Sequence, residues 1–402
     1  MGSNDTRDRL AEIQAGTHAV IDLDRYASNL KTVAELAGPN RSVMAVVKAN
    51  AYGHGAPACA RAAVDAGCRY LGVARIDEAL ELRGSGITAP ILVIGPPNMA
   101  EIGLAIENDI ALTVATETSA AQVIDQAESR NRRAIVHVKI DTGLHRYGAL
   151  PDLAVAIAGR IDSHPATMLE GLYTHFSSAD EEELEPTVEQ IERFQATYTR
   201  IRERGIDPQL VHIANSAATI TGLFPDTNMV RAGIVSYGLD PSNEITAPAG
   251  FRQILTLKTV ITRRFTLEAG ESVSYNRTYT ASEDESAAAV PIGYADGIER
   301  HLSNTGWLMH ADGRCPIIGR VCMDQSVISA PASAHEGDPV TVISDGSDGA
   351  MTVAVVGEIC GTNTYEPVTR IAARVPRLYL RNGAPVSWSV PILGESGTFR
   401  ST

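Results

Sequence analysis

The feature that most constrains the fold is a series of short apolar runs that recur between about residues 43 and 235. They are VMAVVK (43–48), RYLGVA (69–74), PILVIG (90–95), ALTVA (111–115), AIVHVKID (134–141), MLEGLYTH (168–175), LVHIAN (210–215) and MVRAGI (229–234). Most of these runs are continuously apolar and do not alternate with polar residues. Such runs indicate strands that are buried on both faces of a parallel sheet.

The segments between the runs predict helices. Residues 56–67, 76–86, 117–130 and 185–205 show helical apolar spacing, and three of these four segments end in glycine. Eight strands alternating with helices favour an α/β fold, a (β/α)8 TIM-type barrel. A doubly wound open sheet is the main alternative, but no G-x-G-x-x-G follows the first run.

The pattern changes after about residue 250, where strand-like segments with glycine-bearing turns replace the helical spacing. We therefore expect a barrel over residues 14–250 and a C-terminal mostly-β domain over residues 251–390. Residues 1–13 and 391–402 are expected to be tails.

Composition excludes several classes of function. The net charge of −14, without a dense Lys/Arg face, argues against a nucleic-acid partner. No apolar run approaches the ~18 residues that a membrane span needs, and the N-terminus lacks the apolar segment of a signal peptide. The five cysteines include no C-x-x-C pair, which predicts neither a disulfide framework nor a zinc site. We expect a cytoplasmic protein without a metal.

Polar residues gather where the predicted strands end, and in a barrel of this type the active site lies at the C-terminal ends of the strands. These residues are Lys48, Arg75, Lys139 with Asp141, His175, Asn215 with Ser216, and Arg231. Any one basic residue here could be a salt-bridged strand terminus. Several in register favour a functional site.

Lys48 and the last two predicted loops point to one cofactor. A half-buried lysine loses its proton readily and is a candidate Schiff-base nucleophile. The loops after strands seven and eight often bind phosphate in barrels, and here they offer the Ser216 hydroxyl and backbone N–H groups around Gly233 and Ile234. A lysine that faces a phosphate site is what pyridoxal 5′-phosphate requires. Gly233 could instead reflect tight packing.

The motifs VVKANAYGHG, VKIDTGLHRYG, GLYTHFSSAD, HIANSAAT, VRAGIVSYGLDPS, VSYNRTYTA, PIGYADG, IGRVCMDQ and GTNTYE occur in chain order from about residue 18 to residue 377. Together they resemble the alanine racemase family. The resemblance implies a barrel joined to a β domain, pyridoxal phosphate as cofactor, and a homodimer whose subunits share their active sites. The cofactor-binding residues that it implies are Lys48, Tyr52, His175, Asn215, Ser216, Arg231, Gly233, Ile234 and Tyr365.

The resemblance also implies two bases on opposite faces of the substrate. Lys48 would take the α-proton of the D enantiomer, and Tyr275 of the partner subunit that of the L enantiomer. A free phenol has a pKa of ~10, so cationic donors must lower the pKa of Tyr275, and His175 and Arg231 are the candidates. Without the resemblance, Tyr275 would be interpreted as a strand residue packed in the β domain.

Three further basic residues acquire roles from the resemblance. Arg231 would meet the pyridine nitrogen, which it cannot protonate because guanidinium only donates. Arg231→Glu is therefore expected to change the cofactor's absorbance and to slow racemisation. Lys139 would be either carbamylated, holding Arg146 near the substrate carboxylate, or a cation paired with Asp141.

The resemblance places the Met323 backbone N–H at the substrate carboxylate, and Tyr275 with Tyr365 at a narrow gate that suits a methyl side chain. The implied activity is interconversion of L-alanine and D-alanine, supplying D-alanine for peptidoglycan. A broad-specificity small amino acid racemase that accepts serine is the alternative. A pyridoxal phosphate decarboxylase and a non-catalytic cofactor-binding barrel are weaker ones.

Overall fold

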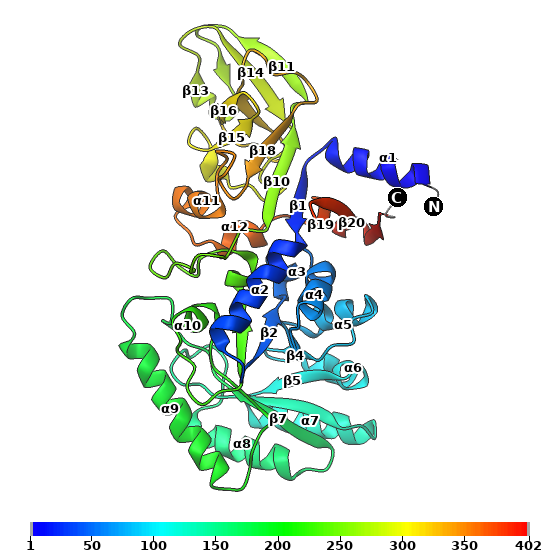
Figure 1. Cartoon of the computed structure of the whole chain (residues 1–402), viewed down its shortest axis with the longest axis vertical. Helices are drawn as coiled ribbons and strands as arrows, with labels where there is room; N and C mark the ends of the chain where they lie inside the picture. The colour runs from blue at the N-terminus through cyan, green and yellow to red at the C-terminus, as the bar shows by residue number, and fades with distance from the viewer. Residues whose placement is uncertain (1–2, 400–402) are drawn as a thin grey trace.

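The computed structural model describes residues 3–399, and side chains from residue 8 onward. Two lobes are stacked along the long axis, a barrel with surrounding helices and a β-rich lobe (Figure 1). A helix, α1 (Ser3–Gln14), projects to one side next to β20 (Ala384–Val390), and the two chain ends lie near each other there.

The predicted barrel is confirmed. Its parallel strands follow the spatial order β8-β7-β6-β5-β4-β3-β2-β9. They are β2 (Ser42–Val46), β3 (Tyr70–Val73), β4 (Ile91–Val93), β5 (Ile110–Val114), β6 (Ala134–Lys139), β7 (Thr167–Tyr173), β8 (Leu210–His212) and β9 (Met229–Ala232). The first and last strands in this order are joined by main-chain hydrogen bonds from Asn228 N to Val211 O and from Arg231 N to Ala214 O, each 3.1 Å. The sheet therefore closes on itself.

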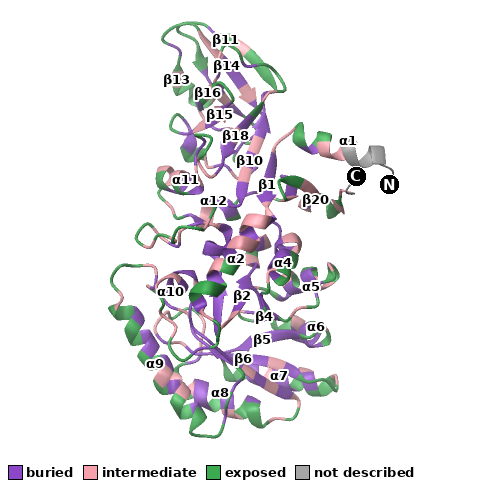
Figure 2. Ribbon diagram, in the orientation of Figure 1, coloured by how far each residue is buried: buried purple, intermediate pink, exposed green. Residues whose placement is uncertain are grey.

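Helices cover the outside of the barrel. They are α2 (Leu23–Ala37), α4 (Ala56–Asp65), α5 (Ile76–Gly84), α6 (Ile102–Glu107), α7 (Glu117–Ser129), α8 (Pro151–Ser163) and α9 (Glu185–Arg202), with the short helices α3 (Lys48–Tyr52), α10 (Ser216–Ile220), η1 (Met99–Glu101) and η2 (Ile234–Tyr237). The strands are almost wholly buried, as Figure 2 shows. Inside the barrel a small apolar cluster includes Met44, Leu92 and Met229, whereas the main core lies between strands and helices.

The second lobe is built mainly on one eight-stranded sheet of order β16-β15-β18-β10-β1-β19-β20-β21. The remaining elements of this lobe are β1 (His18–Asp22), β10 (Leu255–Val260), β11 (Arg263–Leu267), β12 (Ser272–Val273), η3 (Tyr275–Arg277), β13 (Tyr279–Thr280), β14 (Glu285–Val290), η4 (Arg300–Leu302), β15 (Trp307–His310), β16 (Gly313–Pro316), β17 (Ser326–Ser329), β18 (Pro339–Ile343), α11 (Val353–Cys360), α12 (Tyr365–Thr369), β19 (Arg377–Arg381), η5 (Pro391–Leu393) and β21 (Glu395–Thr398). The predicted mostly-β C-terminal part is confirmed.

The structure adds two features at the chain ends. The strand that precedes the barrel, β1, pairs with β10 and β19 and so belongs to the sheet of the second lobe. Within the segment expected to be a C-terminal tail, β21 pairs antiparallel with β20.

Candidate active site

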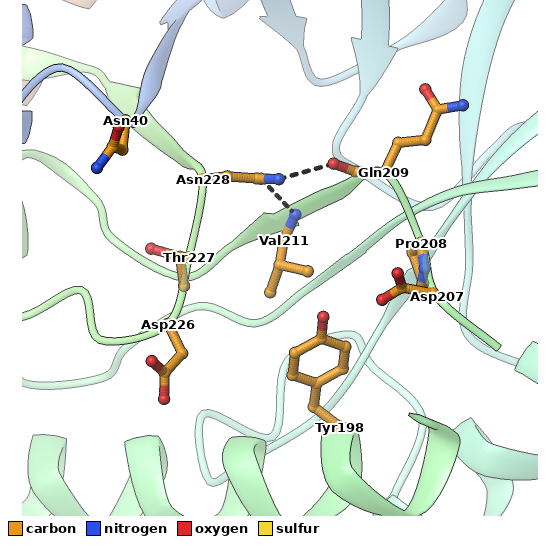
Figure 3. Close-up of a pocket in the computed structure, with 9 residues that line it drawn as sticks. All are labelled: Asn40, Tyr198, Asp207, Pro208, Gln209, Val211, Asp226, Thr227 and Asn228. Atoms are coloured by element: carbon orange, nitrogen blue, oxygen red, sulfur yellow. Dashed lines mark hydrogen bonds between the residues drawn. The ribbon is translucent and has the colours of Figure 1, made fainter. Parts of the chain in front are cut away.

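The two ends of the barrel differ in what they could bind. A pocket of about 490 Å³ opens at the N-terminal ends of β8 and β9, lined by Tyr198, Asp207, Asp226 and neighbouring polar residues (Figure 3). The residues expected at the C-terminal strand ends lie at the opposite end of these strands. This second end carries the chemistry.

Four basic side chains, Lys48, Lys139, Arg146 and Arg231, are close enough at this end to repel one another. Burial comes first among the causes that lower the pKa of Lys48, and the Arg146 and Arg231 charges add to it. Burial, Arg231 and Arg146 together lower the pKa of Lys139 to about 7. In residues 8–399, no carboxylate lies within ion-pair distance of any of the four. Glu78 near Lys48 and Asp141 near Lys139 offset this charge only in part, so the site carries excess positive charge that an anionic ligand would balance.

Lys48 stands at the start of α3, immediately after β2. This turn is left-handed, because Ala49, Asn50 and Ala51 have φ/ψ values near 50° and Tyr52 has a φ of 53°. A continuous left-handed turn of non-glycine residues is rare, since each such residue is strained. The left-handed turn carries both Lys48 and Tyr52 on one short, strained segment.

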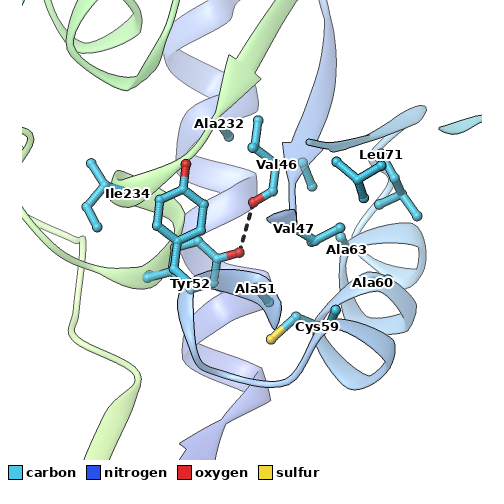
Figure 4. Packing of buried hydrophobic residues seen from close by; sticks show 14 of the residues in the cluster. Val46, Val47, Ala51, Tyr52, Cys59, Ala60, Ala63, Leu71, Ala232 and Ile234 are labelled. Carbon is cyan, nitrogen blue, oxygen red and sulfur yellow. Dashed lines mark hydrogen bonds between the residues drawn. The ribbon is translucent and has the colours of Figure 1, made fainter. Parts of the chain in front are cut away.

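Tyr52, Ser216 and Gly233 surround a small space. A Cβ added to Gly233 would lie 3.0 Å from the Tyr52 hydroxyl and 3.5 Å from the Ser216 hydroxyl. The Gly233 N–H donates to Ser216 Oγ at 3.0 Å, and Figure 4 shows Ile234 beside Tyr52. The Tyr365 ring centroid lies 6.1 Å from that of Tyr52. The Gly233 N–H is thus already engaged, and the Tyr52 and Ser216 hydroxyls line a small cradle that a phosphate could fill.

Asn215 contributes to the site through the helix that it caps. Its side-chain oxygen accepts a hydrogen bond from Ala218 N at 2.9 Å and so caps α10. It thereby fixes the turn that presents Ser216.

Arg231 is buried at the end of β9 with its two terminal nitrogens fully engaged. Nη1 donates to His212 O at 2.9 Å and lies 3.1 Å from His212 Nδ1. Nη2 donates to Thr174 O and Ile213 O and lies 3.0 Å from His175 Nδ1. Nε donates to no residue within the described range, so it remains available to a ligand acceptor. Burial lowers the pKa of Arg231 to about 10, which leaves it cationic at neutral pH.

His175 differs from its expected charge state. Burial and then the Arg231 charge lower its pKa well below the usual value. The prediction that His175 serves as a cationic donor is therefore wrong at neutral pH. Because Arg231 donates to Nδ1, the neutral ring carries its proton on Nε2, from which it can still donate.

A buried polar relay that the sequence did not reveal runs from Arg231 into the barrel. His212 Nε2 lies 3.0 Å from His137 Nδ1, and His137 Nε2 lies 2.9 Å from Glu170 Oε2, which also accepts from the Tyr70 hydroxyl at 2.7 Å. Arg231 can only donate, so His212 Nδ1 must accept. His212 Nε2 then donates to His137 Nδ1, and His137 Nε2 donates to Glu170. These residues lie within the apolar runs. The only sequence signal for them was that His137 and Glu170 are polar residues in predicted buried strands.

Lys139 and Asp141 are not paired. Asp141 Oδ1 accepts from the N–H groups of Gly143 and His145, and its other oxygen lies 3.5 Å from His145 Nδ1. The Lys139 ammonium instead lies 5.5 Å from the Tyr173 ring centroid. The expected pairing of Lys139 with Asp141 is therefore not a direct ion pair within 4.0 Å, although the nearby Asp141 charge still raises the pKa of Lys139 against burial and the arginines. Arg146 is exposed beside this loop.

Tyr275 and Met323 lie in the second lobe. Tyr275 is 68% exposed in η3, and Met323 is 53% exposed. Tyr275 lies between β12 and β13, and Figure 1 shows β13 far along the molecule from α3. One chain therefore does not bring Tyr275 to Lys48. The Met323 N–H donates to no group in the described chain, whereas the Met323 carbonyl accepts from Ala295 N at 2.9 Å.

Several other features bear on the site. In the part of the chain that the structure describes, no cluster of three or more His, Cys, Asp or Glu residues could hold a metal ion. No helix of residues 3–399 combines the length and the apolar character that crossing a membrane requires. All five cysteines are unpaired.

Comparison with known proteins gives a consistent result across the chain. The family model of the alanine racemase N-terminal domain matches residues 21–241, and that of the alanine racemase C-terminal domain matches residues 254–379. An alanine racemase of Desulforamulus reducens is 40% identical over 376 residues, covering 90% of this chain and 98% of that protein.

Two solved structures illustrate the range of similarity. The alanine racemase from Bacillus anthracis with bound L-Ala-P is 37% identical with a TM-score of 0.87, covering 96% of this chain and 98% of that one. The histidine racemase from Leuconostoc mesenteroides is 29% identical with a TM-score of 0.84, covering 91% and 98%.

Proposed function

Because this chain belongs to the alanine racemase family, we propose that it is an isomerase that interconverts L-alanine and D-alanine with pyridoxal 5′-phosphate bound at Lys48. The observation that carries the proposal is the group of four basic side chains, without carboxylate partners in the described residues, around a lysine at the end of a barrel strand.

The residues present fit the cofactor. The cradle of Tyr52, Ser216, Gly233 and Ile234 suits its phosphate, since Gly233 leaves open the space that a Cβ would fill. The unengaged Nε of Arg231 suits an acceptor nitrogen that must stay unprotonated. When bound, pyridoxal phosphate delocalises the electron pair left on the substrate α-carbon.

Lys48 serves as one base in this proposal. Its lowered pKa, from burial and then from neighbouring cations, leaves more of the amine unprotonated near neutral pH than in an ordinary lysine. It takes or returns the α-proton on its own face of the substrate.

Tyr275 of the partner subunit serves as the second base on the opposite face. Its exposure and its place far from Lys48 in the same chain support delivery across a homodimer interface. Ser274, Asn276 and Arg277 all have positive φ values, between 46° and 65°, so the phenol projects from a strained turn. Arg231, not the neutral His175, is the buried cation at the end of the barrel that this phenol would approach.

Arg146 and the Met323 N–H bind the substrate carboxylate. Arg146 is an exposed cation without an ion-pair partner in the described residues, and the Met323 N–H is an unengaged donor. Lys139 is carbamylated in the proposed enzyme, which would give Arg146 an anion to pair with. A pKa of about 7 supports this, since only the neutral amine adds carbon dioxide.

The expected setting is a reducing cytoplasm, and the five unpaired cysteines support this. The D-alanine formed would be supplied to peptidoglycan. A broader small amino acid racemase is the second candidate, favoured by the similarity to a histidine racemase. The gate that Tyr275 and Tyr365 would form is where the two candidates are expected to differ.

The test uses purified protein with added pyridoxal phosphate. The absorbance of a Schiff base should appear, and borohydride reduction should attach the cofactor covalently to the peptide that contains Lys48. Lys48→Ala should show neither the absorbance nor the attachment, and the control Lys31→Ala should show both. Optical rotation should then decay with L-alanine much faster than with L-serine or L-histidine. Equal decay with all three would favour the broader enzyme, and no decay with any of them would contradict the proposal.

A further inference from the structure

The left-handed turn needs external support. Four consecutive residues with positive φ, Ala49 to Tyr52, cost about 1–2 kcal/mol each relative to right-handed backbone. A segment of this kind persists only where its surroundings hold it. Lys48 and Tyr52 lie at its two ends, so whatever holds the turn sets their positions.

Barrel groups hold the beginning of the turn. Ala49 N donates to Glu78 Oε1 at 2.6 Å. Asn50 accepts at both its oxygens, from Ala56 N at 2.8 Å and from Gly55 N at 2.9 Å. The end of the turn at Gly53 has a different support, which comes from the other lobe.

Arg377 on β19 grips that end. Its Nε and Nη2 both donate to the single carbonyl of Gly53, at 3.1 and 3.0 Å. Its remaining hydrogens go to the carbonyls of Ala372, Val375 and Ile371. All five N–H bonds of the guanidinium are thus directed at backbone carbonyls.

The environment of Arg377 is costly for a cation. The side chain is fully buried, and no carboxylate pairs with it in residues 8–399. Burial lowers its pKa to about 10. A buried charge without an anion is rare unless its hydrogen bonds serve a purpose. Here the charge joins the loop before β19 to the left-handed turn.

The same strand face meets the turn a second time. Alternate residues of a strand share a face, and Tyr379 follows Arg377 by two. A Cβ on Gly55 would lie 1.9 Å from the Tyr379 hydroxyl, and a Cβ on Gly53 would lie 2.0 Å from the Val368 carbonyl of α12. The face of β19 and the end of α12 therefore pack so closely against Gly53 and Gly55 that no side chain would fit at either position.

We propose that Arg377 is a positioning residue that holds Lys48 and Tyr52 in place through the Gly53 carbonyl. This inference rests on the proposed function, because it assigns Lys48 the role of cofactor lysine. The β-rich lobe then supports its own barrel's lysine while it offers Tyr275 to the partner's.

Arg377→Lys tests the proposal, since an ammonium keeps the charge but lacks the planar fork that grips one carbonyl twice. Arg381→Lys is the matched control, because Arg381 lies on the same strand and bonds to Leu23 and Asp24, not to the turn. The readout is the rate at which pyridoxal phosphate added to each purified chain forms a Schiff base, measured across pH.

With Arg377→Lys the turn relaxes and Lys48 gains water. We expect its pH profile to shift toward alkaline pH by about one unit, its cofactor dissociation constant to rise about 10-fold or more, and amide hydrogen exchange of residues 48–56 to accelerate. Arg381→Lys should match the wild type in all three. A folded Arg377→Lys chain with the wild-type pH profile and dissociation constant would overturn the proposal.

Arg377→Ala, purified with millimolar guanidinium, is the second variant. Guanidinium should enter the vacated space and restore Schiff-base formation in this variant alone. If neither Arg377 variant gives a folded chain by circular dichroism, Arg377 is a folding residue and the positioning role is wrong. A wild-type chain that does not react with pyridoxal phosphate would instead contradict the proposed function itself.

Discussion

At the scale of single residues, Lys139 shows how position determines charge. Its stem follows β6 into the barrel, so burial weakens hydration of the ammonium, and the nearby Arg231 and Arg146 repel it. Its pKa falls to about 7 in the folded chain, from the ordinary lysine value of 10.5. The folded chain therefore binds fewer protons than the unfolded chain between those two values.

Lys139→Met should stabilise the protein at low pH. Below pH 7 the wild type must keep the buried ammonium charged, whereas Met carries no charge, so we expect a gain on the order of 2 kcal/mol in the free energy of unfolding. As pH rises from about 7 to 10.5, the wild-type lysine loses its proton in the folded state and the gain should shrink. Denaturant titrations in buffers free of carbon dioxide measure it. A pH-independent difference between the two chains would contradict the assigned pKa.

Glu170→Gln tests the relay behind Arg231. Hydrogen bonds from His137 and Tyr70 outweigh burial and lower the pKa of Glu170, so it is the anion that orders the two imidazoles. Glutamine keeps the shape but removes the charge, so the relay can reverse and Arg231 loses its fixed acceptor. We expect kcat to fall about 10-fold with KM changed less than about 2-fold, and the bound cofactor's absorbance to shift. Glu189→Gln, on an exposed helix face, is the control, and identical spectra in both variants would argue against the relay.

At the scale of elements, both proposed bases lie on strained turns. Lys48 begins the left-handed α3, and Tyr275 lies among Ser274, Asn276 and Arg277, which all have positive φ. The sequence KANAY gives no sign of this strain, because alanine is equally compatible with an ordinary helix. Backbone strain arises from tertiary contacts such as that of Arg377 with Gly53, so sequence patterns could not predict it.

Asn215→Ala should weaken cofactor binding through an element, not through contact. Loss of the cap on α10 costs about 1 kcal/mol and frees the turn that presents Ser216. We expect the dissociation constant for pyridoxal phosphate to rise about 5-fold, measured by fluorescence titration. Asn215→Ser retains a capping oxygen and should lie close to the wild type; a loss in Ser as large as in Ala would indicate that the amide itself contacts the cofactor.

Much of the barrel could be predicted because its strands are buried on both faces and hence continuously apolar, as in residues 43–48 and 229–234. The ends of these strands also showed where the basic residues meet. His137 and Arg377 could not be recognised, since each shares its strand with another basic residue, Lys139 and Arg381, and only the folded neighbours show which partner each one has. The neutral state of His175 likewise follows from charges brought together by folding.

At the scale of the whole molecule, segments from both ends of the chain connect the two lobes. The strand β1 from the N-terminal end enters the sheet of the β-rich lobe, and Arg377 of that lobe reaches back to the barrel turn. Figure 1 nevertheless shows β13, which follows Tyr275 in the chain, far along the molecule from α3, which begins with Lys48. Under the proposed function, a second copy would bring its Tyr275 to each barrel.

Mixing two inactive variants should restore activity. Lys48→Ala and Tyr275→Phe each abolish both sites of their own dimers, but a mixed dimer has one site with both native residues. Random exchange of subunits makes half of the dimers mixed, so we expect about a quarter of wild-type racemisation. The activity should appear only after dissociation and reassociation of the mixture. Recovery that needs no subunit exchange, or none after proven exchange, would contradict shared sites.

Isotope exchange from heavy water into each enantiomer by Tyr275→Phe tests the two-base claim most directly. Loss of the phenol should leave Lys48 able to remove the α-proton of D-alanine while removal from L-alanine falls by about 10³-fold or more. We predict deuterium uptake into D-alanine with almost none into L-alanine, against uptake into both by the wild type. Equal uptake, or equal loss, for the two enantiomers in Tyr275→Phe would contradict the account.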